Sequence, residues 1–168
     1  MTIMPIRTLG DPVLRETCRP VEGFDAVLAR LADDLFQTMY DAPGVGLAAN
    51  QVGLRIACFV YDDREGYSGF VANPSLSEPA GEQVEPEGCL SIPGPYAQTA
   101  RSMGVRLRGL DLHGQPIDLR AEGLLARIFQ HETDHLGGAL YIDRLDDDGR
   151  RDVMRQLREL ELERRGEP

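Results

Sequence analysis

Several residue types are scarce or missing in this chain of 168 residues. It has no tryptophan and only three cysteines, Cys18, Cys58 and Cys89. An odd number of thiols in a chain of this length does not suit a disulfide framework. No apolar stretch approaches the roughly 20 residues that a membrane-spanning helix needs. The sequence therefore predicts that the cysteines are free thiols or metal ligands, and it gives no sign of a membrane partner.

The chain also has fewer basic than acidic residues. Lysine is absent, so all 18 basic residues are arginine, and 28 acidic residues bring the formal net charge to -10. An acidic surface repels polyanions, which argues against nucleic acid or anionic lipid as a direct partner. Residues 1–5 lack the basic and then apolar layout of a signal or transit peptide. We therefore expect a cytoplasmic protein in which residues 1–168 form one domain.

The hydrophobic pattern predicts both helices and strands. Apolar residues recur at helical spacing over residues 24–40, where Asp25 is placed to cap the helix, and over 150–165. Apolar runs predict buried strands at 55–61 and 70–73, and alternation predicts a hairpin of 105–112 with 117–119, with His113 exposed at its turn. Pro79 and Gly81 indicate a loop over 75–83.

A pair of histidines lies in a third helical pattern, which starts near Glu122. His131 and His135 are four residues apart, so in a helix they project from one face and can reach one cation. Glu132 flanks the same face, where its carboxylate could touch a water on the metal rather than the metal itself. The pattern H-E-x-x-H also occurs on helices that bind nothing. A catalytic site of this kind therefore requires a third protein ligand elsewhere in the chain.

The candidate third ligand is Cys89, which lies in a segment, 85–94, that is bounded by glycine and proline. A thiolate and two imidazoles suit a borderline-soft divalent metal and leave one coordination position for water. The alternative is an inert buried thiol.

A run of small residues over 44–53 is unusual, because neither a packed strand nor a helix would normally choose it. Glycine and alanine let another backbone approach closely, as a peptide does when it pairs with a strand edge. A tight crossing in the core is the alternative. Gln51 is the polar side chain in this run that could donate two amide protons to a substrate, although it could also satisfy the local backbone.

Three segments, 44–51, 87–91 and 130–136, together resemble the three signature motifs of peptide deformylases, in the expected order. The similarity extends from residues 11–15 to the last helix. The resemblance implies an α+β fold, with mixed antiparallel sheets around a central metal-binding helix and a C-terminal helix. It also implies an activity: removal of the N-formyl group from the N-terminal formylmethionine of nascent bacterial polypeptides, with release of formate.

The resemblance also implies roles for individual residues. It suggests Fe2+ as the metal, although zinc, nickel and cobalt can occupy the same ligands. A supporting ion pair between Arg101 and Asp134 is expected behind the site. The implied metal ligands are Cys89, His131 and His135, the general acid/base is Glu132, the oxyanion donors are Gln51 and the Leu90 backbone N–H, and the substrate-binding residues are Gly44, Val45, Gly46 and Leu124.

The chain departs from the family pattern at three places. Asn50 stands where many relatives carry threonine, Glu85 where some have an apolar pocket residue, and Tyr96 where others have arginine. These departures concern the pocket and its substrate preference rather than the chemistry.

Three alternatives stay open from the sequence: a zinc endopeptidase, which the thiolate and Gln51 disfavour, a relative that binds without turnover, and a cysteine hydrolase with Cys89 as nucleophile. The last helix is mildly basic in an acidic chain. Such a pattern is usually a solvated face, and a ribosome contact is the functional hypothesis for it.

Overall fold

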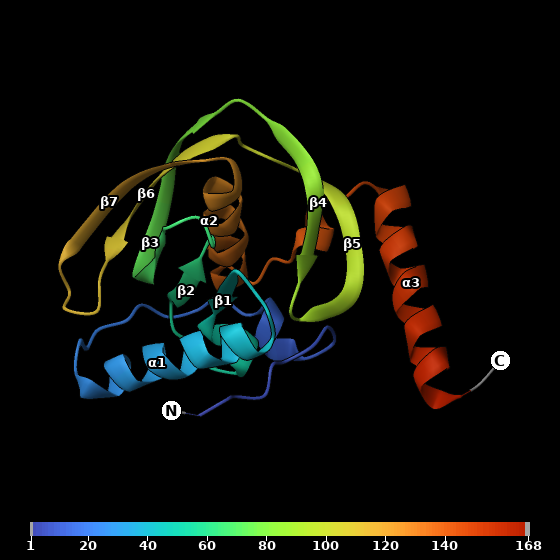
Figure 1. Cartoon of the computed structure of the whole chain (residues 1–168), viewed down its shortest axis with the longest axis horizontal. Helices are drawn as coiled ribbons and strands as arrows, with labels where there is room; N and C mark the ends of the chain where they lie inside the picture. The colour runs from blue at the N-terminus through green and yellow to red at the C-terminus, as the bar shows by residue number, and fades with distance from the viewer. Residues whose placement is uncertain (1, 167–168) are drawn as a thin grey trace.

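The computed structural model describes residues 2–166, so Met1, Glu167 and Pro168 of the expected domain lie outside the described residues. Figure 1 shows α2 at the centre, between two groups of strands, with α1 below it and α3 at the edge. The elements in chain order are η1 (Pro12–Arg15), α1 (Ala26–Asp41), β1 (Gly46–Ala48), η2 (Ala49–Val52), β2 (Cys58–Asp62), β3 (Ser68–Ala80), β4 (Gln83–Cys89), β5 (Ile92–Arg101), β6 (Gly104–Leu110), β7 (Pro116–Glu122), α2 (Gly123–Leu136), η3 (Tyr141–Arg144) and α3 (Asp147–Arg165).

The described strands form two antiparallel sheets. One has five strands in the order β1-β2-β3-β6-β7, and the other is the hairpin of β4 and β5. The predicted hairpin is confirmed as β6 paired with β7, and His113 is exposed at its turn. The α+β class with a central helix is therefore confirmed.

The helix boundaries follow from their caps. The Asp25 side chain accepts hydrogen bonds from the backbone N–H groups of Val27 and Leu28, so α1 begins at Ala26, close to the predicted start. The last helix begins at Asp147, three residues before the predicted start. Asp146 caps this helix by accepting from the Gly149 N–H, and acidic side chains in the first turn are favourable at the positive end of a helix dipole.

The predicted loop over 75–83 is wrong for most of its length. β3 continues to Ala80 and pairs with β6, with register shifts on either side of the paired residues 75–77. Asn73 and Glu78 have positive φ angles of 50° and 52°, and such irregular positions let the strand bend around Pro79 without losing its partner. Pairing with a distant strand therefore overrides the local breaking signals.

The small-residue run, whose composition is unusual for a packed strand or helix, forms a short piece of each. Residues 46–48 form β1, which pairs with β2 at the end of the five-stranded sheet, and residues 49–52 form the buried 3-10 helix η2. Small residues are required there because other chain segments lie close. A Cβ on Gly44 would come 2.7 Å from the Leu90 side chain, and one on Gly46 would overlap the Glu132 carboxylate.

α2 is held in place by its apolar face and by its end. Phe129 is fully buried, and its ring packs edge-on against Tyr61 with centroids 5.0 Å apart. At the end of the helix, the Leu136 carbonyl accepts from the Cys18 N–H at 2.9 Å and the His135 carbonyl accepts from the Asn50 amide at 2.6 Å. The strands and the N-terminal segment thus fix the helix that carries both histidines.

Candidate active site

The structure brings the three predicted metal ligands together. Cys89 ends β4, whereas His131 and His135 lie one turn apart on α2. Cys89 Sγ is 3.2 Å from His135 Nε2, which is 3.1 Å from His131 Nε2, and the three donor atoms lie within 4.8 Å of one another. A tetrahedral ion with bonds of about 2.0–2.3 Å separates its donors by roughly 3.3–3.8 Å. The two shorter separations are close to this range, so the donor set can hold one metal ion.

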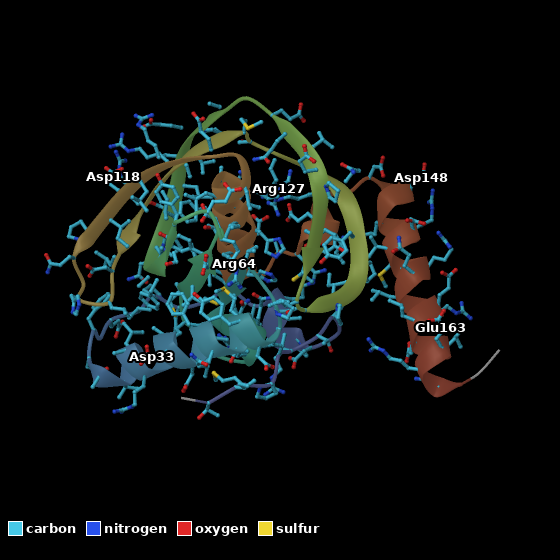
Figure 2. All side chains as sticks on the ribbon, viewed as in Figure 1. Asp33, Arg64, Asp118, Arg127, Asp148 and Glu163 are labelled. Carbon is cyan, nitrogen blue, oxygen red and sulfur yellow. The ribbon has the colours of Figure 1, made fainter. Side chains whose placement is uncertain are left out.

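Glu87 orients one of these imidazoles. Its Oε1 lies 2.6 Å from His131 Nδ1, which places the proton on that nitrogen and leaves the Nε2 lone pair facing the other two donors. Glu87 also accepts from Arg101 at 2.5 and 3.1 Å and from Arg127 at 2.5 Å. Arg127 comes from α2 and is labelled between that helix and β4 in Figure 2. The sequence analysis included Glu87 in a motif but gave it no role, and its position two residues before a candidate ligand was the available signal.

The predicted ion pair between Arg101 and Asp134 is present. Arg101 Nη1 lies 2.6 Å from the Asp134 carboxylate, and the Arg101 side chain has no exposed surface. Arg144, which the sequence analysis missed, makes two further hydrogen bonds of 2.6 Å to Asp134. Arg101 thus joins the carboxylates of Glu87 and Asp134 behind the ligand helix.

These contacts set the charge states around the site. Burial opposes charge on Glu87, but hydrogen bonds from His131 and Arg101 outweigh it and hold its pKa well below the usual value. Burial likewise disfavours a charged His131, yet its contacts with Cys89 and Glu87 raise the pKa of this imidazole, so a metal ion would have to displace a proton from its Nε2 on binding. Burial and the neighbouring His131 lower the pKa of His135, so this ring stays neutral, which is the form that binds metals.

Glu132 has a different environment. The residue is 4 % exposed, and burial raises the pKa of its carboxyl group to about 7. Its Oε2 has no hydrogen-bond partner among the described residues, and its Oε1 side packs over Gly46. A carboxyl group that is held in place but not paired is suited to exchanging a proton.

Of the two readings of Gln51 that the sequence left open, the structure bears out the contact with the local backbone. Its Oε1 accepts from the Ala48 N–H at 2.9 Å, which satisfies the local backbone. Its Nε2 lies 3.1 Å from Ser91 Oγ and 3.6 Å from Cys89 Sγ, so the amide donors point toward the candidate ligand Cys89 and its neighbour Ser91.

A cleft of about 510 Å³ gives access to this centre. Asn50 is buried behind the cleft, where it donates to the His135 carbonyl, and Glu85 is exposed on β4 and does not line the cleft. Tyr96, the third departure from the family pattern, lines it. The predicted site residues that line the cleft are Gly44, Val45, Gly46, Gln51, Cys89, Leu90, Leu124, His131 and Glu132.

This combination of fold and site defines a class of protein. A central helix presents two imidazoles to a thiolate at the floor of a cleft, with an unpaired buried glutamate beside them. These are the parts of a metal-dependent hydrolase.

Comparison with known proteins gives the family. The sequence model described as polypeptide deformylase matches residues 3–151. The chain is 48% identical over 161 residues to the peptide deformylase of Acidothermus cellulolyticus, covering 96% of this chain and 89% of that protein. It is 50% identical over 163 residues to peptide deformylase 1 of Corynebacterium efficiens, covering 94% and 96%. The crystal structure of a peptide deformylase from Legionella pneumophila superposes with a TM-score of 0.92 at 39% identity, over 99% of this chain and 100% of that one.

The chain belongs to the polypeptide deformylase family. Members of the family remove the N-formyl group from the formylmethionine at the start of nascent polypeptides and release formate, and this chain is an enzyme of that kind.

Replacing Gly46 by alanine should impair the reaction without unfolding the protein. The added methyl group would lie 2.8 Å from Glu132 Cδ, so the carboxylate would have to move. Because a misplacement of about 1 Å can slow a reaction about 100-fold, we expect a fall in kcat of that order. Formate release would be measured beside Gly23→Ala, whose methyl group meets nothing within 4 Å. A kcat for Gly46→Ala within twofold of this control would contradict the close packing.

Replacing Arg101 by alanine should destabilise the protein. The change leaves the buried carboxylate of Glu87 and the partly buried carboxylate of Asp134 without their shared cation, and breaking a buried pair typically costs about 3–5 kcal/mol. Arg144→Ala is the matched control, because this second partner of Asp134 is 45% exposed and should contribute less than about 1 kcal/mol. Urea denaturation of both metal-loaded variants would measure the difference. Unchanged stability, metal content and activity in Arg101→Ala would rule out a supporting role.

Proposed function

We propose that Cys89, His131 and His135 hold one divalent metal ion and leave a coordination position open to the cleft. The spacing of the three donor atoms supports this assignment, because it suits a single ion. The contact between Glu87 and His131 Nδ1 supports it further, since it turns the other ring nitrogen toward Cys89 and His135. Residues 2–166 are proposed to act as one catalytic domain around this centre.

Glu132 is proposed as the general acid/base. When bound, the metal supplies Lewis-acid chemistry, because it lowers the pKa of water and polarises the formyl oxygen. Glu132 accepts the proton of the attacking water and returns it to the amine nitrogen of methionine as the C–N bond to the formyl carbon breaks. The unpaired Oε2 supports this role, since a carboxylate already bound to arginine would be a poor base.

Gln51 and the backbone N–H of Leu90 are proposed to stabilise the negative charge that develops on the formyl oxygen. The orientation of Gln51 supports this: its carbonyl oxygen is occupied by the Ala48 N–H, which turns its amide protons toward Cys89. Leu90 directly follows that ligand and lines the cleft. Losing one such donor typically lowers kcat by about 10²–10³.

The substrate is proposed to be an N-formyl-methionyl nascent peptide. Val45 and Leu124 line the cleft with partly exposed apolar side chains that suit the flexible thioether of methionine. Gly44 and Gly46 are proposed to offer their backbone to the peptide. The position of β1 at the end of its sheet supports this, because a peptide can be added beside an end strand.

A test of the assignments uses Glu132→Ala. Because Glu132 is not one of the proposed ligands, the variant should keep its metal and lose most of its formate release from formyl-Met-Ala-Ser. The wild-type enzyme should not cleave an internal peptide bond, and a chelator should abolish its activity. Metal loss in Glu132→Ala would contradict its placement. Cleavage of an internal bond would favour an endopeptidase, and resistance to chelators would favour Cys89 as a nucleophile.

The native metal is proposed to be Fe2+, with zinc, nickel and cobalt as alternatives for the same ligands. The mixed thiolate and imidazole donors support this group of metals over calcium or magnesium. Elemental analysis of the same protein, purified without oxygen, would identify the ion, and an iron-free but active preparation would contradict iron.

The enzyme is proposed to work in the cytoplasm, where nascent chains emerge, and α3 is proposed to contact the ribosome. No helix among residues 2–166 is long and apolar enough to cross a membrane. α3 lies at the edge of the molecule, beside β5, and Val153 is the buried residue in its 19-residue length (Figure 1). This arrangement supports a contact, because most of the helix surface stays accessible.

Reversing two exposed charges on α3 would test the ribosome contact. Deleting the helix would remove Val153 from the core, so Arg158→Glu combined with Arg164→Glu is the cleaner change. We expect co-sedimentation with ribosomes at low salt to fall severalfold, because rim charges steer and stabilise such contacts. Arg30→Glu, on the exposed side of α1, is the control. Equal co-sedimentation of the two proteins would exclude the contact.

A further inference from the structure

The wall of the cleft just before β1 is held from outside by an arginine. Arg64 lies in the loop between β2 and β3, next to α1, and is labelled in Figure 2. Its Nη2 donates a hydrogen bond of 3.0 Å to the Gly44 carbonyl. Gly44 and Val45 line the cleft, whereas Arg64 is not among the described residues that line it. The Gly44 carbonyl therefore points out of the cleft, toward the loop.

Three consecutive peptide groups lead into β1, and each has a different partner. The Gly44 N–H donates to the Met39 carbonyl at 2.8 Å. The Val45 carbonyl accepts from the Asp62 N–H at 2.9 Å. Backbone atoms thus fix the first and the third group, whereas the second, between Gly44 and Val45, is held by the Arg64 side chain. Because glycine tolerates most backbone angles, this second group could rotate if that side chain were removed.

The carbonyl that Arg64 holds determines where the N–H of the same peptide group points. The bond between Gly44 and Val45 is trans, so its C=O and its N–H point in opposite directions. With the carbonyl directed toward the loop, the Val45 N–H is directed toward the cleft. The C=O and N–H of Gly44 both have partners within the chain, so the Val45 N–H is the donor that this segment can offer to a peptide in the cleft.

Arg64 is itself fixed by its neighbours. Its guanidinium lies over the Tyr40 ring, 4.7 Å from the ring centroid. The Asp62 carboxylate accepts from the Arg64 N–H at 2.8 Å and from the Tyr40 hydroxyl at 2.9 Å. The Arg64 φ angle of 63° lies in the left-handed region, where a residue other than glycine persists only when the surrounding contacts hold it. A side chain that is 49% exposed is thus held as a fixed donor.

We propose that Arg64 is a positioning residue: it holds the peptide group between Gly44 and Val45 so that the Val45 N–H donates to the methionine carbonyl, the first backbone acceptor beyond the formyl group. The proposal rests on the proposed function, in which this end of β1 offers its backbone to the peptide. The methionine carbonyl does not react, so its hydrogen bond is the same before and during the reaction. Losing such a bond weakens binding of substrate and transition state alike, which raises KM and leaves kcat nearly unchanged.

The experiment measures formate release from two substrates by metal-loaded full-length enzyme. One is formyl-Met-Ala-Ser. The other is an isostere in which an (E)-alkene replaces the peptide bond after methionine, so that the carbonyl is removed and the length is kept. For formyl-Met-Ala-Ser, we expect Arg64→Ala to raise KM by about three- to tenfold, the size of one hydrogen bond, with kcat within about twofold of the wild type. For the isostere, the kcat/KM values of Arg64→Ala and the wild type should agree within about twofold.

Two further variants separate the hydrogen bond from packing and from charge. Arg64→Met keeps an apolar stem beside the Tyr40 ring but removes the donors, so it should raise KM as Arg64→Ala does. Arg30→Ala removes the same charge from the exposed side of α1, and Arg30 is not among the described residues that line the cleft. This variant should leave KM unchanged for both substrates.

Three results would overturn the proposal: an unchanged KM in the Arg64 variants, a loss carried by kcat alone, or a loss of equal size with the isostere, which would mean that Arg64 only stabilises the loop. Arg64→Met decides the question if Arg64→Ala does not fold. Formate release from formyl-Met-Ala-Ser by the wild type tests the proposed function separately. Its absence would overturn that function, whereas release that is insensitive to the Arg64 variants would overturn only the role of Arg64.

Discussion

One buried carboxylate, that of Glu87, holds the two halves of the site together. It lies on β4, and it accepts hydrogen bonds from Arg101 of β5 and from Arg127 and His131 of α2. A buried charge is stable only when it is paired and hydrogen-bonded, so the hairpin and the helix have to meet in one arrangement. That arrangement brings Cys89, two residues further along β4, to the imidazoles. The proposed metal ligands are therefore positioned by an ion-pair network that lies behind them.

The opposite wall of the site is shaped by the lack of side chains. Glu132 leaves the helix on the side of β1, and its carboxylate occupies the space that a side chain on residue 46 would need. The Leu90 side chain occupies the corresponding space at Gly44. Close packing of this kind fixes a functional group without giving it a hydrogen-bond partner. Gly44 and Gly46 are thus needed for close packing against Leu90 and Glu132. This requirement is compatible with a role in binding a peptide backbone.

Interactions that are local in sequence could be predicted from the residues themselves, whereas distant ones such as the ion pair between Arg101 and Asp134 could be predicted only from the family resemblance. The spacing of His131 and His135 and the cap at Asp25 are properties of single helices, and they were read correctly. The extension of β3 depends on pairing with β6, some 30 residues away, so Pro79 and Gly81 were misleading. Glu87 was missed because its partners lie 14, 40 and 44 residues further along the chain. Cys89 could be expected beside the histidines only because a catalytic site with two histidines requires a third ligand.

The two glutamates that line the cleft show how environment rather than residue type assigns a chemical role. Glu87 is surrounded by cations and stays ionised, so it can orient His131 but cannot exchange a proton near neutral pH. Glu132 is equally buried, but its Oε2 has no partner among the described residues, and burial moves its pKa in the opposite direction. When two carboxyl groups have environments that separate their pKa values, one can stay ionised in a structural role while the other can exchange a proton. Because Arg101, Arg127 and Arg144 pair with Glu87 and Asp134, these positive charges are not paired with Glu132, the group that is proposed to move the proton.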